Sequence, residues 1–163
     1  MKRFILCLFF CLAYLYSGAT GQMHDKITIE GESWDMFTSP LSLLDTKTAE
    51  AFKILVGNRT AISSANWRGY VAYWHIGKKG LFLDKVEVIR PGGKHQIVEA
   101  KALRKALRKY SCLGRIKARW LTGNIRIGKG AADPSPSAPH VLNHAEKRIL
   151  VLKNGKVMMT AEM

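Results

Sequence analysis

The chain has 163 residues, 47% of them hydrophobic and 23% charged, and its 26 Lys and Arg against 12 Asp and Glu leave a formal net charge of +14. This length supports one domain with a core of ordinary size, which argues against a multi-domain enzyme and a wholly disordered chain. A mean hydropathy of -0.06 argues against a polytopic membrane protein.

The first 19 residues have the pattern of a secretory signal peptide. Lys2 and Arg3 precede an unbroken run of 13 apolar residues at 4–16, and three small residues then end at Ala19, where we expect cleavage. The run is shorter than the roughly 20 residues of a spanning helix, and a retained N-terminal anchor is the alternative. The sequence therefore predicts an exported protein, periplasmic or extracellular, with one mature domain over 20–163.

Export changes the cysteine count. Cleavage would remove Cys7 and Cys11 and leave Cys112 as the single thiol of the mature chain. One thiol cannot form an internal disulfide, so the core alone must supply the stability. No His/Asn pattern near Cys112 indicates a nucleophile, and we expect a buried or idle thiol.

The mature chain opens with an alternating strand at 26–30 and a helix within 43–55. Asp45 or Thr46 is the expected cap of this helix, and Gly57 and Asn58 are its expected end. Asn58 also begins an Asn-Arg-Thr glycosylation acceptor, which matters only if the source glycosylates its proteins.

Two hairpins are predicted further along the chain. Strands at 69–76 and 81–89 flank a Gly-Lys-Lys-Gly turn, and strands at 148–152 and 156–159 flank Asn154-Gly155. A Pro-rich stretch at 131–139 predicts an irregular loop. Together these elements predict the α+β class, as a single β-rich domain with a twisted antiparallel sheet and one or two helices.

An aromatic and arginine cluster surrounds the start of the first hairpin. Trp67, Arg68 and Tyr70 lie there, and Trp120 stands at the end of a later alternating segment. These four residues form a possible binding face, because arginine stacks on aromatic rings and pairs with carboxylates. They fit better with a core in which an arginine locks the start of a strand, and we favour that interpretation over a binding face.

The charge excess is local. Residues 100–132 hold ten basic side chains and no acidic one, whereas the rest of the mature chain is close to neutral. The segment 98–110 predicts a basic amphipathic helix, and 114–120 predicts a half-buried strand with its cations toward water. The candidate residues for binding an anion or a partner are Lys101, Arg104, Lys105, Arg108, Lys109, Arg115, Lys117 and Arg119.

Uncompensated cations on one face attract anions, so the expected partner is a protein or an anionic component of the cell envelope. Nucleic acid is disfavoured, because an exported protein meets little of it and no aromatic-glycine RNA-binding signature occurs. A membrane surface suits the amphipathic helix, but so few large apolar residues would bind lipid only weakly. A solvated face without a ligand is the alternative.

No motif points to a metal or a cofactor, and we expect neither. The segment 123–130 approaches a phosphate-binding loop, but glycine replaces the hydroxyl residue that would hold magnesium. His140 and His144 have the spacing of two zinc ligands on a helix, yet they follow a Pro-rich stretch. His24 and His95 have no evident partners.

No motif points to a catalytic site either. The carboxylates nearest the predicted strands are Asp35, Asp84, Glu87 and Glu99, and nothing in the sequence brings two of them together.

Three segments resemble a family of small uncharacterised bacterial proteins. Residues 66–76 fit its pattern N-W-R-G-Y-x-A-x-W-x-I, residues 120–127 fit W-x-T-G-x-[IL]-R-I, and 146–157 fit its closing hairpin. The resemblance implies a shared fold and supplies no catalytic or binding residue. The chain departs from the pattern at Gly128, where the family usually has proline.

These observations predict an exported binding or interaction protein, and its small size and β scaffold suggest by analogy an inhibitor- or immunity-like role. The alternative is a cell-envelope enzyme that acts on an anionic substrate steered by the basic segment.

Overall fold

A computed structural model of the chain describes residues 23–57, 66–135 and 138–163. The predicted signal peptide at 1–19 and the acceptor Asn58 lie outside these residues. Among the helices of the described part, none is long and apolar enough to cross a membrane.

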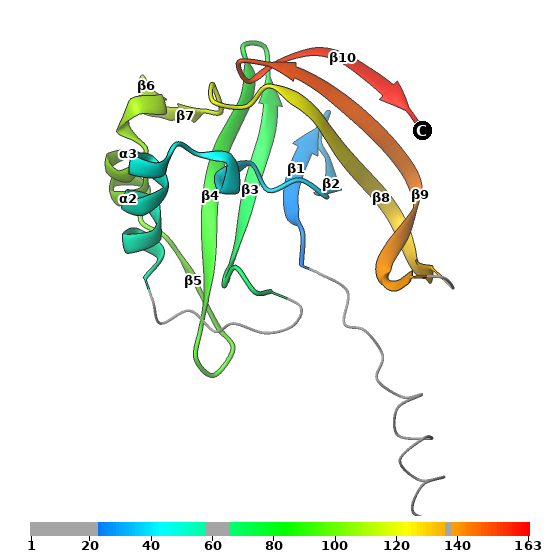
Figure 1. The fold of residues 1–163 in the computed structure, drawn as a ribbon, viewed down its shortest axis with the longest axis horizontal. Helices are drawn as coiled ribbons and strands as arrows, with labels where there is room; N and C mark the ends of the chain where they lie inside the picture. The colour runs from blue at the N-terminus through cyan, green and yellow to red at the C-terminus, as the bar shows by residue number, and fades with distance from the viewer. Residues whose placement is uncertain (1–22, 58–65, 136–137) are drawn as a thin grey trace, which may run out of the picture.

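Ten strands of the described chain form one sheet in the order β10-β9-β8-β2-β1-β3-β4-β7-β6, with β5 paired to β4 (Figure 1). Neighbours are antiparallel except β1 and β3, which run parallel. This confirms the predicted α+β class with a mainly antiparallel sheet. The strands are β1 (Asp25–Ile29), β2 (Glu32–Met36), β3 (Tyr70–Gly77), β4 (Gly80–Arg90), β5 (Lys94–Ile97), β6 (Ser111–Cys112), β7 (Arg115–Lys117), β8 (Gly123–Ser135), β9 (Ala138–Lys153) and β10 (Lys156–Glu162).

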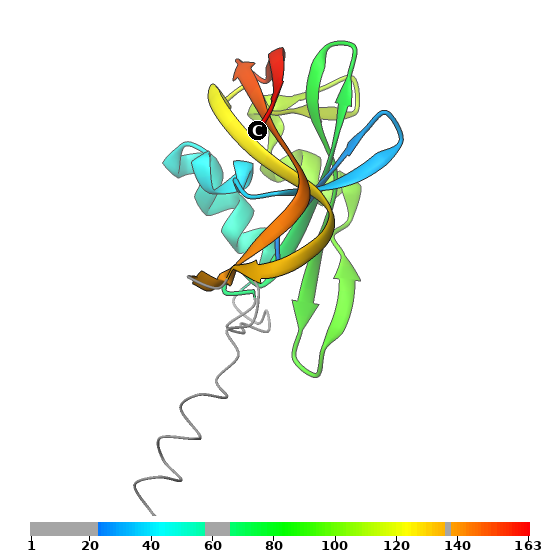
Figure 2. The same ribbon diagram turned by 90° about the vertical axis from the view of Figure 1, so that its right-hand side faces the viewer.

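Two α-helices, α2 (Thr46–Val56) and α3 (Ala100–Ala106), lie together beside β6 and β7 (Figures 1 and 2). Short 3-10 turns, η1 (Pro40–Leu43) and η2 (Arg108–Tyr110), complete the helical structure of the described residues. The predicted cap and end of the first helix are confirmed: Asp45 accepts a hydrogen bond from the Thr48 backbone N–H at 3.2 Å, and Gly57 follows the last turn with φ +80°.

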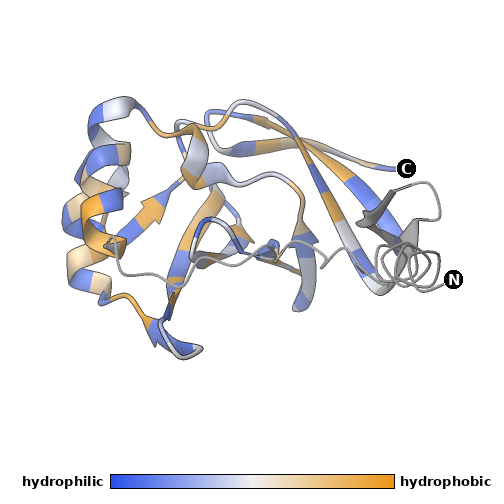
Figure 3. Ribbon diagram, turned by 60° about the horizontal axis from the view of Figure 1, so that its bottom comes forward, coloured by the Kyte–Doolittle hydropathy of each residue, from blue (hydrophilic) through white to orange (hydrophobic). Residues whose placement is uncertain are grey.

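The core follows from alternation along the strands, visible as alternating apolar and polar segments in Figure 3. Ile27 on β1 lies opposite Trp34 on β2 and Trp74 on β3, and all three are almost fully buried. Ile125 on β8 and Leu150 on β9 continue the buried face as a directly opposed pair. Side chains of period two on each strand thus build one continuous apolar layer.

Both predicted hairpins form. Gly77 and Gly80 pair at the β3–β4 turn, and Asn154 and Gly155 adopt φ values of +50° and +70° at the β9–β10 turn. Positive φ at both central residues is what an Asn-Gly turn provides.

The Pro-rich stretch is more regular than the sequence predicts. β8 continues to Ser135 and β9 begins at Ala138, so strand structure occupies most of the expected loop at 131–139. The pairing shifts register between Lys129 and Ala132 and again after Pro134. A β-bulge tolerates proline because the bulged residue donates no backbone N–H to the partner strand. The prolines of this segment therefore predict more irregular structure than it has.

Other boundaries also differ from expectation. The basic helix ends at Ala106 and continues only as η2, and the strand predicted at 114–120 is confined to Arg115–Lys117. β2 and β5 were not predicted, because both are short and gain their structure from pairing with a neighbour.

Candidate functional site

The basic segment folds around a groove of about 700 Å³ between the β3–β4 turn and the β6–β7 hairpin. We call this the cationic groove. It is lined by Gly77, Lys78, Lys79, Phe82, Cys112, Leu113, Arg115, Lys117 and Arg119. Three of the predicted cations, Arg115, Lys117 and Arg119, therefore line the same groove as Lys78 and Lys79. These two lysines are not among the candidates that the sequence predicts.

Strand pairing explains which side chains face the groove. β7 pairs with β4, with Lys117 opposite Phe82 and Ile116 opposite Leu83. Ile116 is buried, so its neighbours Arg115 and Lys117 point the other way, as period two requires. The Arg115 guanidinium lies 6.0 Å from the centre of the Phe82 ring, which forms an apolar wall between the cations.

The charged side chains that line the groove are all cationic. Lys78, Lys79, Arg115, Lys117 and Arg119 make no ion pair within the described residues, and no described lining residue is acidic. Cations gathered without counter-charge raise the local concentration of anions. Cys112 also lines the groove and is exposed, so of the two expectations, a buried or an idle thiol, burial is wrong.

The helical cations lie in a different setting. Lys105, Arg108 and Lys109 line a second hollow of about 420 Å³, together with Asp45 and Lys47. Lys101 and Arg104 line neither hollow. The two basic groups adjoin, because Arg119 of the groove donates a hydrogen bond to the Lys109 carbonyl oxygen at 2.9 Å.

Asp45 lines the second hollow and makes structural contacts there. Its carboxylate accepts hydrogen bonds from the Tyr110 hydroxyl at 2.8 Å, the Lys109 ammonium at 3.1 Å and Thr48. The Tyr110 bond is the largest cause that holds the pKa of Asp45 well below its usual range. One carboxylate therefore caps α2 and ties it to η2.

Asp45→Asn is expected to lower the melting temperature by about 2–4 °C at pH 7, because asparagine can still cap α2 but loses the charged contacts with Lys109 and Tyr110. A depressed carboxyl pKa contributes stability above the unfolded-state pKa, and this is lost as pH falls through the folded-state value. The variant should therefore approach the wild type in acid. Thermal unfolding between pH 7 and pH 2 checks this, because the stabilisation is lost only below the unfolded-state pKa of about 3.9. A deficit independent of pH would contradict the prediction.

The proposed aromatic binding face is not continuous. Trp67 is 65% exposed, but Tyr70 is buried against Phe52, with ring centres 5.3 Å apart. Trp120 packs on Tyr110 at 4.5 Å and donates its indole N–H to the Pro40 carbonyl oxygen. Among these aromatic residues only Trp67 faces solvent freely.

Arg68 enters a buried polar cluster instead of a surface. Its guanidinium lies 2.9 Å from the carboxylate of Asp25, which is fully buried, and donates hydrogen bonds to Ser39 and the Met23 carbonyl oxygen. Burial raises the pKa of Asp25, and the guanidinium opposes that shift. Arg68 thus fastens the first strand to the start of β3.

The carboxylates considered for catalysis have different partners. Asp84 contacts His75 at 2.5 Å, whereas Glu87 accepts a hydrogen bond from the Tyr73 hydroxyl at 2.7 Å. Burial and Glu87 together raise the pKa of Tyr73 to about 12. Glu99 precedes α3 without a side-chain cap bond. These three carboxylates therefore occupy separate settings, and within the described residues none of them forms an acid–base pair with another.

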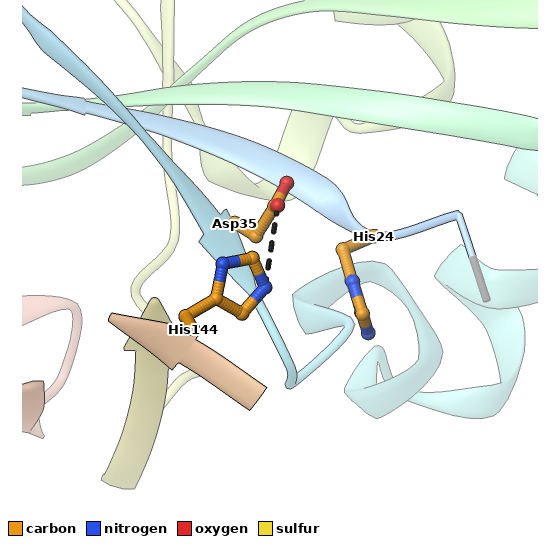
Figure 4. A group of neighbouring side chains, drawn as sticks. All are labelled: His24, Asp35 and His144. Atoms are coloured by element: carbon orange, nitrogen blue, oxygen red, sulfur yellow. Dashed lines mark ion pairs between the residues drawn. The ribbon is translucent and has the colours of Figure 1, made fainter. Parts of the chain in front are cut away.

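A further cluster, His24, Asp35 and His144, joins residues far apart in the sequence (Figure 4). Their ligand-type atoms all lie within 4.8 Å of one another, and His144 Nε2 is 3.5 Å from an Asp35 oxygen. Burial is the main cause that lowers the pKa of His24. The His140–His144 spacing pointed to His144, but no local pattern indicated its partners on other strands.

Comparison with protein-family models, curated proteins and solved structures finds no match for this chain. The resemblance to the small bacterial family therefore stays a prediction.

Proposed function

We propose that this is an exported binding protein that recognises an anionic polymer of the cell envelope through the cationic groove. The observation that supports the proposal is the gathering of five cations around Phe82 without an acidic lining residue. Such a surface binds carboxylate, sulfate or phosphate groups spaced along a chain, because each group can meet a different cation.

The groove favours binding over catalysis. Its lining offers cations, an aromatic ring and one thiol, but no carboxylate or histidine to act as a general base. Phe82 is stacked on His75, with ring centres 5.3 Å apart, but His75 itself does not line the groove. An enzyme acting on an anionic substrate is the alternative, and it would need catalytic groups from outside this lining.

The test is binding to heparin oligosaccharides as a sulfated probe. The groove variant Lys78→Ser/Lys79→Ser/Arg115→Ser removes three exposed cations, and the control Lys53→Ser/Lys94→Ser/Lys101→Ser removes three exposed cations elsewhere. We expect the groove variant to lower the slope of log binding constant against log salt by roughly one for each lost contact. The control should bind like the wild type.

If the groove variant and the control lose heparin affinity equally, then net charge and not the groove attracts the polymer. This result would overturn the proposal. Vesicles with acidic phospholipids and double-stranded DNA serve as comparison ligands. Tighter binding to either of them than to heparin would replace the polymer by a membrane or a nucleic acid as the partner.

A further inference from the structure

The side chains of His24, Asp35 and His144 come from three separate elements. His24 directly precedes β1, Asp35 lies on β2 and His144 lies on β9 (Figure 4). β1 pairs with β2, and β2 pairs with β8, which in turn pairs with β9. The sheet therefore holds Asp35 and His144 together, and His24 joins them from the residue directly before β1.

His144 is unusual because it is buried without conventional hydrogen bonds. The residue is only 5% exposed, and within the described residues neither ring nitrogen makes a hydrogen bond. Its one ion-pair contact among the described residues is with the Asp35 carboxylate, with Nε2 and Oδ2 3.5 Å apart. A buried polar group left in this state is costly unless another ligand completes its surroundings.

The backbone makes room for this histidine. A Cβ at Gly128, the residue opposite Asp35 on β8, would lie 2.7 Å from the His144 ring. Phe37 covers the other side, with its ring centre 4.9 Å from that of His24 and 5.3 Å from that of His144. Glycine and phenylalanine thus hold both imidazoles beside the carboxylate.

We propose that His24, Asp35 and His144 bind a divalent transition-metal ion of the zinc class. Two imidazoles and one carboxylate are a common ligand set for such ions, and three protein ligands leave a fourth position for water or an external group. This site is independent of the cationic groove and departs from the expectation of no metal drawn from the sequence.

The distances fit the ion after a small movement. Metal–ligand bonds of about 2.1 Å place tetrahedral ligands about 3.4 Å apart, which is close to the 3.5 Å between His144 and Asp35. The widest separation in the cluster, at most 4.8 Å, must shorten by no more than about 1.4 Å. Rotation of the half-buried His24 side chain can supply this movement, because no strand contains it.

Lys26 defines which carboxylate oxygen is available. Its ammonium pairs with Oδ1 of Asp35, while Oδ2 faces His144. An outer partner of this kind orients a ligating carboxylate, as in many metal sites.

The test is zinc titration of the purified full chain by calorimetry at pH 7, with magnesium as the comparison ion. We expect one zinc per chain, a zinc-dependent rise in melting temperature, and no such rise with magnesium, which prefers oxygen ligands. His24→Gln and Asp35→Asn should each weaken zinc binding by at least about 10–100-fold. His24 and Asp35 are both partly exposed, so we expect both variants to fold. Their melting temperatures measured without metal check this.

The matched controls are His95→Gln, an exposed histidine away from the cluster, and His140→Gln, the partner suggested by sequence spacing. Both should bind zinc like the wild type. Loss of binding in His140→Gln with none in His24→Gln would assign the ion to the 140/144 pair and overturn the proposal. Absence of zinc binding, or equal binding in His24→Gln and the wild type, would overturn it as well.

Discussion

Arg68→Ala is expected to lower the free energy of unfolding by about 3–5 kcal/mol, because it leaves a buried carboxylate without its counter-charge. Asp25 is fully buried, and the guanidinium is its one ion-pair partner within the described residues. The Ser39 hydroxyl at 3.3 Å and the Ala72 backbone N–H at 3.1 Å remain, but neither carries charge. Urea unfolding at pH 7 measures the loss.

Two further variants isolate the cause. Arg115→Ala removes an exposed arginine and should change stability by no more than about 0.5 kcal/mol. The double variant Arg68→Ala/Asp25→Asn should be more stable than Arg68→Ala alone, because a neutral amide replaces the uncompensated charge. If the double variant were less stable than the single one, lost packing of the arginine and not its charge would explain the effect.

Gly80→Ala is expected to destabilise the protein by about 2–5 kcal/mol. Gly80 has φ +128°, and its Cβ would overlap the backbone carbonyl oxygen of Gly155 and lie 2.9 Å from Lys117 Cε. A side chain in this conformation is strained, and a backbone carbonyl cannot rotate away as a side chain can. That carbonyl also accepts the Leu81 N–H at 2.7 Å, so moving it breaks a hydrogen bond between the two turns.

Gly31→Ala is the matched control for this glycine. Gly31 also has positive φ, +86°, in the β1–β2 turn, but a Cβ there would meet nothing within 4 Å. Gly31→Ala should therefore lower the free energy of unfolding only by the cost of the strained backbone conformation, about 1–2 kcal/mol. If Gly80→Ala and Gly31→Ala lower the free energy of unfolding equally, the contact between the two turns contributes nothing to stability.

The cationic groove and the metal cluster lie on different parts of the sheet. The groove is built on β4, β6 and β7, whereas the cluster involves β2, β8 and β9. Variants at the two sites share no contacts and their effects should add. The heparin and zinc measurements can therefore succeed or fail separately.

Local patterns predicted much of the fold. Period-two alternation located β3 and β4, an Asn-Gly pair located the β9–β10 turn, and Asp45 located the start of α2. Each of these signals acts within a few residues, which is why a single sequence carries it. β2 and β5 escaped prediction because pairing, not composition, makes them strands.

The candidate sites show the same division. The sequence identified Arg115, Lys117 and Arg119 as cations on one side of a strand, because alternation is a local property. It could not associate them with Lys78 and Lys79, which reach the groove only because β7 pairs with β4.

By itself, therefore, the sequence determined the β-rich class, the local nature of the charge excess, the cap of α2 and the tight turns. Only the tertiary structure decided that Arg68 is buried on Asp25, and that His24 and Asp35 meet His144. The physical reason is that such contacts depend on strand order and register across the whole sheet. Neither of these is encoded in a local run of residues.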